Sequence, residues 1–181
     1  FIDRLIFTEN HNYNKVINKY KKNILERNKI LQGNNYDLNW IKTIENEISK
    51  MGIEIYKLRY QKLSILNEHI KILNKSNKYN FNIELKIKDD FYNMNLEQEM
   101  YKFSLYKNRD YDKKFGGSKI GPHKSDILGT VNNNIDSSLL STGQQKTIVL
   151  ILILAQCNYL VNVKKIKPIV LLDEICSHLD K

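Results

Sequence analysis

The chain contains little cysteine, proline or glycine, with two, two and seven of these residues among 181. Its two cysteines, Cys157 and Cys176, are too few for a disulfide framework or a four-ligand zinc site, which favours a reduced, cytoplasmic protein. The scarcity of glycine and proline excludes collagen-like and proline-rich linker proteins. Apolar residues make up 41% of the chain, close to the globular average, and this excludes wholesale disorder.

Long apolar runs and a secretory signal are also missing. The longest apolar run, residues 148–155, is far shorter than the roughly 20 residues of a membrane-spanning helix. The N-terminus, Phe1-Ile2-Asp3-Arg4, lacks an initiator Met and has neither the basic region nor the apolar core of a signal peptide. We therefore expect no membrane partner, and we interpret the sequence as part of a longer protein.

Positive charge is in excess. Lysine and arginine together number 29 against 20 acidic residues, so the formal net charge is +9. This excess favours a polyanionic partner, with nucleic acid ahead of a membrane surface. AT-rich codon usage, which also enriches Asn, Ile and Tyr, is the alternative explanation. The basic residues are nearly all lysine, and the exceptions are Arg4, Arg27, Arg59 and Arg109.

Hydrophobic spacing predicts two long helices in the first half of the chain. Apolar residues recur every three or four positions over 13–31, and Gly33 ends the pattern. Asp37 is a suitable N-cap for a second helix, whose apolar seam runs over 41–58 and resumes after a phase slip over 63–73. Two helices joined by a short turn predict an antiparallel hairpin, although two ordinary helices in a globular core fit the spacing equally well.

The rest of the chain mixes strand and helix patterns. We expect strands over 81–87, 127–131, 135–140 and 169–172, and helices over 96–107 and 148–163. The last strand is a continuous aliphatic run, which is typical of a buried strand in a parallel sheet. The pattern predicts an α/β protein with a helical lobe over 1–115 and a second part over 116–181.

Three short motifs in the second part could carry chemistry. Ser141-Thr142-Gly143-Gln144 precedes an apolar helix, whose N-terminus favours phosphate; a plain helix N-cap is the alternative. Asp173-Glu174 follows the aliphatic run, where carboxylates can hold Mg²⁺ and orient a water; two solvated acids at a strand end are the alternative. Ser177-His178-Leu179-Asp180 comes directly afterwards.

The order of these motifs resembles the signature motif, Walker B strand and D-loop of an ATP-binding cassette (ABC) ATPase head. The segment 141–146, Ser-Thr-Gly-Gln-Gln-Lys, is similar to the RecF family, as are Gly-Pro-His-Lys-Ser-Asp at 121–126 and the opening residues 1–5. RecF proteins carry a helical lobe inserted into a head with a parallel or mixed sheet. There are two departures: Glu174 stands where the family commonly has Asp, and Ser125 stands in place of an acidic residue, which puts the role of that loop in doubt.

The resemblance implies an ATPase that uses ATP and Mg²⁺ and forms an ATP-dependent homodimer. It implies that the signature segment faces the nucleotide of the opposite subunit through Ser141, Gly143 and Gln144. It implies that Asp173 holds Mg²⁺ through a water and that Glu174 is the catalytic residue that orients the attacking water. Ser177 and Asp180 would belong to the D-loop, and Asp180 would contact the other subunit.

The resemblance also implies partners and a cellular role. The implied partners are DNA, bound as duplex near single-strand gaps, and the mediator proteins RecR and RecO. The implied role is to help load recombinase in DNA repair, replication, recombination and the SOS response. The DNA contacts would be made mostly between lysine and phosphate, which makes them sensitive to salt and blind to sequence. The residues that bind DNA are not identified by the motifs.

The P-loop pattern G-x-x-x-x-G-K-[ST] is absent from the sequence. We therefore expect ATP hydrolysis of a full-length protein and not of this chain alone. Two alternatives stay open. The first is an SMC-like or Rad50-like head, which the short helices of residues 11–75 disfavour. The second is a non-catalytic DNA-binding or scaffold protein that retains a relic head.

Overall fold

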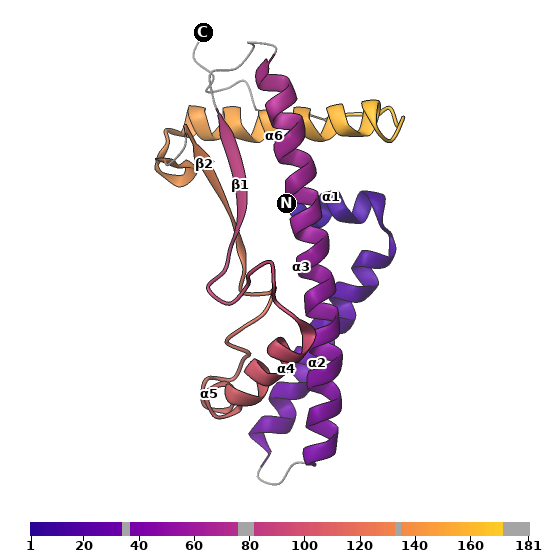
Figure 1. Ribbon diagram of the computed structural model, residues 1–181, viewed down its shortest axis with the longest axis vertical. Coiled ribbons are helices and arrows are strands. Elements are labelled where there is room, and N and C mark those ends of the chain that lie inside the picture. Colours follow the sequence, from indigo (N-terminus) through magenta and orange to yellow (C-terminus); the bar gives the residue numbers. More distant parts are fainter. Residues whose placement is uncertain (34–36, 76–81, 133–134, 172–181) are drawn as a thin grey trace. The chain divides into compact units, whose positions relative to one another are not determined.

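A computed structural model describes residues 1–33, 37–75, 82–132 and 135–171 (Figure 1). The described helices are α1 (Ile2–Glu9), α2 (Asn12–Gln32), α3 (Leu38–Lys75), α4 (Gln98–Lys107), α5 (Arg109–Phe115), α6 (Thr142–Asn162) and a 3-10 turn, η1 (Ser137–Leu139). The described strands are β1 (Ile83–Lys88), β2 (Asp126–Val131) and β3 (Ile135–Asp136). No helix in this part of the chain combines the length and apolar character needed to cross a membrane.

The chain divides into two compact units, each formed by separate segments. Unit 1 consists of residues 1–59 and 89–126, and unit 2 consists of residues 60–88 and the described residues from 127 onward. Both units are discontinuous because α3 continues through residue 59 and because β1 pairs with β2 from later in the chain. The division by motifs into a helical lobe over 1–115 and a head part over 116–181 stays a prediction.

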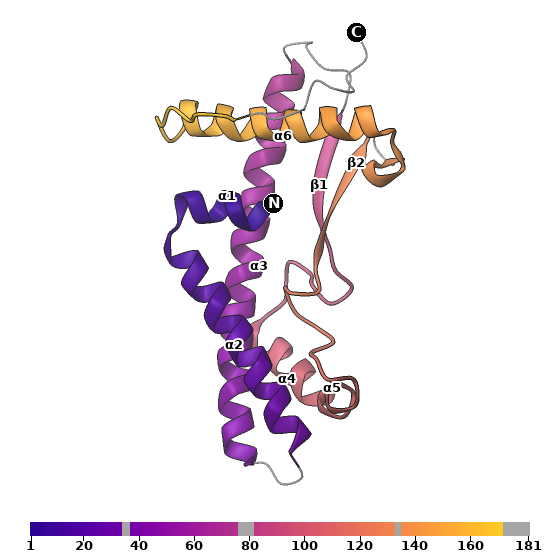
Figure 2. The ribbon, with the colours of Figure 1, turned by 180° about the vertical axis from the view of Figure 1, so that it is seen from behind.

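Unit 1 is built on α2 and the N-terminal part of α3, which lie side by side and run in opposite directions (Figures 1 and 2). The expected helices are confirmed, because Gly33 is the C-cap of α2 and Asp37 Oδ1 accepts a hydrogen bond from the amide of Asn39 at 2.7 Å. The expected seam is also confirmed, because α3 buries Ile41, Ile44, Ile48, Met51 and Ile55. These side chains form one apolar stripe, and burying it stabilises the pair of helices.

A glycine in α3 has a specific role in this unit. Gly52 is buried, and a Cβ atom at this position would collide with the ring of Tyr101 from α4. The weak helix propensity of glycine is therefore offset by close packing of a fully buried aromatic ring. The sequence pattern predicted α4 but neither α1 nor α5, which are only eight and seven residues long.

Unit 2 combines a small sheet with α6 and the C-terminal part of α3. The strand order is β1-β2-β3, and β2 pairs with β3 in antiparallel register, with Thr130 opposite Asp136 and Val131 opposite Ile135. Helix α6 crosses α3 in both views, and His69 Nδ1 of α3 lies 2.6 Å from Asn158 Oδ1 of α6 (Figures 1 and 2). The described sheet is thus small and antiparallel at this pair, where the sequence predicted a parallel or mixed one.

Two of the predicted strands differ from the structure. The strand expected over 135–140 ends at Asp136, because the Asp136 carboxylate accepts the amide of Ser138 at 2.8 Å and begins a 3-10 turn instead. The strand expected over 169–172 is not formed in its described residues, where Ile169 and Leu171 are about nine-tenths exposed. A buried parallel strand needs neighbours on both edges, and β1, β2 and β3 do not pair with this segment.

Candidate functional site

The segment predicted as a signature motif forms the start of α6. Ser141 is the N-cap, and its Oγ accepts a hydrogen bond from the amide of Gln144 at 3.3 Å. The side chain of Gln144 makes the reciprocal hydrogen bond, because its Oε1 accepts from the amide of Ser141 at 3.1 Å. This reciprocal pair is a capping box, which explains why the helix begins here and not at residue 148, where the apolar run starts.

The exposed end of α6 suits an anion. The first amides of a helix have no partner inside the helix, and the capping box uses only that of Gln144 within this first turn. Those of Thr142 and Gly143 therefore remain at the positive end of the helix dipole. The first turn has no acidic residue, and Ser141 and Thr142 are exposed. Hydroxyl and amide donors without a carboxylate are the donor set that a phosphate group requires, so this helix end is compatible with an anion such as phosphate.

The other predicted site residues cannot be placed beside this helix. Asp173, Glu174, Ser177 and Asp180 lie outside the described residues. Among the residues that the structure describes, no group of three or more His, Cys, Asp or Glu side chains could hold a metal ion. The Mg²⁺ and catalytic roles of the acidic pair therefore stay predictions from the resemblance.

The Gly121–Asp126 loop of unit 1 is held by two buried tyrosines. His123 Nε2 donates to the carbonyl of Ser118 at 3.1 Å, so its Nδ1 is the acceptor for the hydroxyl of Tyr20 at 2.8 Å. Tyr20 in turn accepts from Tyr101 at 3.0 Å. Burial raises the pKa of both tyrosines and lowers the pKa of His123, which keeps the phenols protonated and the imidazole neutral. Gly121 has a φ of 123°, and a Cβ atom there would collide with both phenol oxygens.

Arg59 ties the same loop to α1. Its Nη1 donates to the carbonyl of Pro122 at 2.5 Å and to Ser125 Oγ at 2.7 Å, and its Nη2 donates to Asp3 at 2.7 Å. Burial raises the pKa of Asp3, but hydrogen bonds from Arg59 and Tyr13 outweigh it and hold that pKa below its usual value. Ser125, which departs from the family pattern, therefore has a structural partner in this chain.

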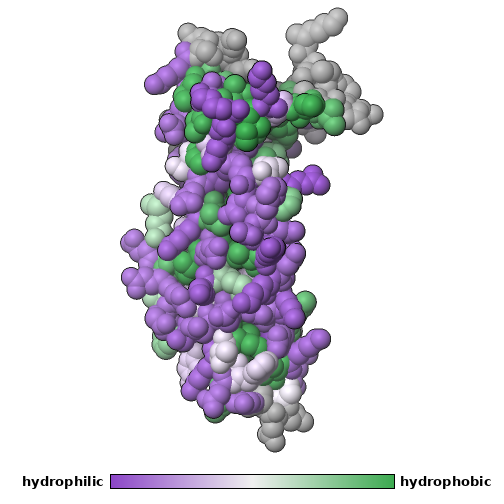
Figure 3. Space-filling view, turned by 90° about the vertical axis from the view of Figure 1, so that its right-hand side faces the viewer, coloured by the Kyte–Doolittle hydropathy of each residue, from purple (hydrophilic) through white to green (hydrophobic). Residues whose placement is uncertain are grey.

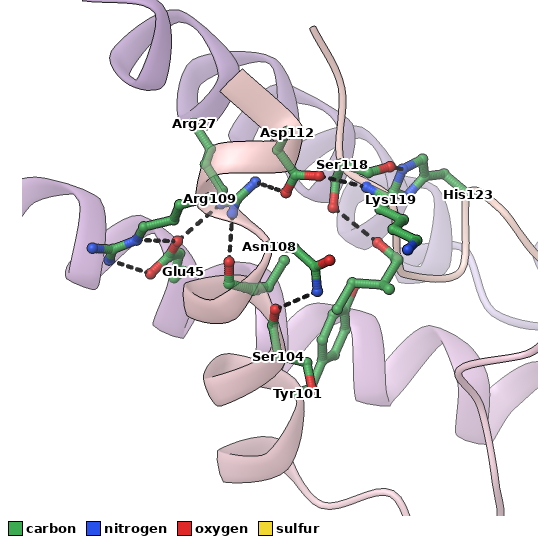
Figure 4. Close-up of polar contacts among 12 residues, drawn as sticks. Arg27, Glu45, Tyr101, Ser104, Asn108, Arg109, Asp112, Ser118, Lys119 and His123 are labelled. Atoms are coloured by element: carbon green, nitrogen blue, oxygen red, sulfur yellow. Dashed lines mark hydrogen bonds and ion pairs between the residues drawn. The ribbon is translucent and has the colours of Figure 1, made fainter. Parts of the chain in front are cut away.

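A buried charge cluster joins four helices of unit 1 (Figure 4). Arg27 of α2 is fully buried and donates to Glu45 of α3 at 3.0 Å, to Asp112 of α5 at 2.6 Å and to the carbonyl of Leu105 of α4 at 2.7 Å. Arg109 donates twice to the same glutamate, at 2.5 and 3.0 Å. Two guanidinium groups and two carboxylates thus balance one another away from water.

Sequence reasoning missed this cluster, although a signal was present. Arg27 lies on the apolar face of α2 between Ile24 and Leu31, a position where a surface cation is not expected. Arginine is also rare in this lysine-rich chain, and Arg27, Arg59 and Arg109 each donate at least two hydrogen bonds. A planar guanidinium can serve several acceptors at once, whereas lysine is a single point charge.

Comparison with known proteins gives matches to RecF, and no family model matches the chain. The DNA replication and repair protein RecF of Rickettsia bellii (strain OSU 85-389) is 36% identical over 185 residues, which cover 99% of this chain and 51% of that protein. RecF of Rickettsia felis is 36% identical over 186 residues, which cover 99% of this chain and 50% of that protein.

Solved structures agree with these sequence matches. A structure described as the recombination mediator protein RecF with ATP in the RecFOR pathway matches with a TM-score of 0.81 and 26% identity. A second, with ATPrS, matches with a TM-score of 0.83 and 26% identity, and each match covers 99% of this chain and 50% of the other.

The resemblance inferred from the motifs is confirmed. The chain is related to RecF over nearly its whole length, and it spans about half the length of the curated relatives it matches.

Proposed function

We propose that this RecF-related chain acts in DNA replication and repair as part of an ATP-dependent protein, in which the start of α6 contacts ATP bound by a second subunit. The observation that carries the proposal is the exposed N-terminus of α6, capped by Ser141, in a chain that matches RecF over 99% of its length. Residues 116–181 would belong to an ABC-type head and residues 1–115 to its helical lobe.

Each predicted site residue has a defined task in this proposal. Ser141 and the amides of Thr142 and Gly143 would hold the terminal phosphate, while Gln144 keeps the helix end in shape through the capping box. Bound ATP would supply the phosphoryl group, with Mg²⁺ neutralising its charge. Glu174 would orient the attacking water, Asp173 would hold the metal ion through a water, and the D-loop residues Ser177 and Asp180 would contact the second subunit.

We propose duplex DNA near single-strand gaps as the principal partner, with RecR and RecO as protein partners. The net charge of +9 supports a polyanion, and Figure 3 shows that hydrophilic residues cover most of the face in that view. Lysine-to-phosphate contacts predict binding that weakens steeply with salt and does not depend on sequence.

Complementation between two defective subunits tests the role of Ser141. The assay uses a chimaera in which this chain replaces the matching segment, 51% of the length, of the Rickettsia bellii protein. We expect Ser141→Arg to abolish ATP-driven dimerisation and hydrolysis, because a long cation fills the place of the phosphate. Mixing it with a P-loop variant should partly restore hydrolysis, since one of the two composite sites in a mixed dimer is then intact.

A neighbouring serine gives the matched control. Ser138 is exposed and lies outside α6, so Ser138→Arg should keep ATP hydrolysis. If Ser141 is only a helix cap, Ser141→Arg lowers stability by about 0.5–2 kcal/mol and mixing restores nothing. If the two folded variants form mixed dimers with each other and hydrolysis is still not restored, the proposal is wrong.

A further inference from the structure

A groove in unit 1 lies between the N-terminal part of α3 and α4. Its volume is about 540 Å³, which is within the usual range of sites for small molecules. The residues that matter for its chemistry are Lys42 and Asn46 of α3, Lys102, Phe103 and Tyr106 of α4, and Arg109 of α5. The groove therefore combines two aromatic rings with cationic and amide side chains.

The two rings are exposed and neighbour each other on one helix. Phe103 is 55% exposed and Tyr106 is 57% exposed, and residues three apart lie on the same side of a helix. The guanidinium of Arg109 lies 4.9 Å from the centre of the Tyr106 ring and is itself fixed by two hydrogen bonds to Glu45. Arg109 is buried, so it supports the inner face of this ring while more than half of the Tyr106 residue stays accessible.

Cations surround these rings. Lys107 Nζ lies 4.5 Å from the centre of the Phe103 ring, and Lys42 is exposed at the rim. Lys102 pairs with Glu99 at 2.9 Å, but this pair is at the surface and contributes little, so Lys102 can exchange it for a stronger anion. Glu45, the buried carboxylate of the groove, is already neutralised by Arg27 and Arg109.

We propose that this groove binds single-stranded nucleic acid, with bases stacked on Phe103 and Tyr106 and with phosphates paired to Lys42, Lys102 and Lys107. Exposed rings beside lysines are the arrangement with which proteins hold single strands without reading sequence. Bases in a duplex already stack on one another, so their faces do not reach such rings. The inference rests on the DNA binding proposed above and adds a single-strand contact to it.

Anisotropy of fluorescein-labelled oligothymidylate with the full 181-residue chain, at low salt and without nucleotide, tests the proposal. The double variant Phe103→Ala/Tyr106→Ala should bind about tenfold or more weakly, while its affinity for a duplex of equal length stays nearly unchanged. An abasic strand of the same length should bind the wild-type chain more weakly than oligothymidylate. Lys102→Gln should reduce the slope of log affinity against log salt by about 0.7.

Two controls keep loss of folding apart from loss of contact. Phe7→Ala removes another exposed ring of unit 1, on α1, and should leave the affinity unchanged. Phe103→Tyr/Tyr106→Phe keeps both rings and should retain binding, and circular dichroism should show the same helix content for all variants.

The outcomes separate this inference from the proposed function. If the double alanine variant binds oligothymidylate as tightly as the wild-type chain, the proposal that this groove binds single strands is wrong. The two rings would then be a contact surface for a protein. An equal loss for oligothymidylate and duplex, or equal affinity of the wild-type chain for abasic and normal strands, also overturns it. A wild-type chain that binds neither single strand nor duplex contradicts the proposed DNA function as well.

Discussion

Replacing Arg27 tests how strongly the buried charge cluster holds unit 1 together. Arg27→Met keeps an unbranched side chain but removes three donated hydrogen bonds, to Glu45, Asp112 and the carbonyl of Leu105. The side chain of Arg27 is fully buried, and so is that of Asp112, so water cannot replace the lost donor without opening the unit. Among the described residues, the carboxylate of Asp112 keeps the hydrogen bond from the amide of Lys119, at 2.8 Å.

Removing one partner of a buried ion pair costs about 3–5 kcal/mol, because the other charge is left without compensation. The free energy of unfolding of a whole domain is about 5–15 kcal/mol. For a domain of about 12 kcal/mol or less, a loss of about 4 kcal/mol therefore removes a third or more of that free energy. Arg27→Lys should recover part of the loss, since it restores the charge but cannot reach three acceptors in different directions. The exposed pair of Lys19 and Glu47 offers a control, and Lys19→Met should cost at most about 1 kcal/mol.

Urea unfolding followed by circular dichroism at neutral pH measures these differences. A double variant, Arg27→Met/Asp112→Leu, should be more stable than Arg27→Met alone, because it removes the stranded carboxylate. If Arg27→Met unfolds within about 1 kcal/mol of the wild-type chain, the cluster does not stabilise unit 1 and the reasoning is wrong.

Two further predictions concern the loop and the glycine of α3. Gly52→Ala should destabilise the chain by about 1–3 kcal/mol despite the better helix propensity of alanine, since its methyl group meets Tyr101; a stabilised variant in thermal melts would show that the ring moves aside. Burial holds the pKa of His123 below its unfolded value of about 6.5, so its contribution to stability is fully present above that pH and is lost as pH falls through the folded pKa. Urea unfolding between about pH 5 and 8 should therefore show a stability loss in acid that His123→Gln reduces, and an unchanged profile in that variant would contradict the assignment.

The sequence predicted the long helices because their signal is repeated many times. The seam of α3 buries residues at spacings of three and four from Ile41 to Ile55 and again from Leu63 to Ile70, and each repeat supports the same helix. Helices α1 and α5 are too short for such repetition, and their positions depend on partners elsewhere in the chain. Asp3 of α1 pairs with Arg59, and Asp112 of α5 pairs with Arg27, contacts that local spacing does not encode.

The sequence predicted the helix cap of the candidate site, but it did not predict the reciprocal hydrogen bond of that cap or the groove on unit 1. Ser141 as a helix cap follows from its residue type and its place before an apolar run, and the structure confirms it. The capping role of Gln144 was not foreseen, because the motif suggested a nucleotide contact for it. The groove at Phe103 and Tyr106 depends on α3 and α4 meeting in space, which helical periodicity alone does not encode.

The Asn67 side chain pairs with β1 at the edge of the sheet that the described residues of unit 2 form. The Asn67 side chain of α3 donates to the carbonyl of Leu85 at 2.9 Å and accepts the amide of Leu85 at 2.8 Å, as a neighbouring strand would. Strand β1 is at one end of the order β1-β2-β3, and open strand edges recruit strands from other molecules. A single amide on a helix thus takes the place of the next strand, and it protects this edge at Leu85 from intermolecular association.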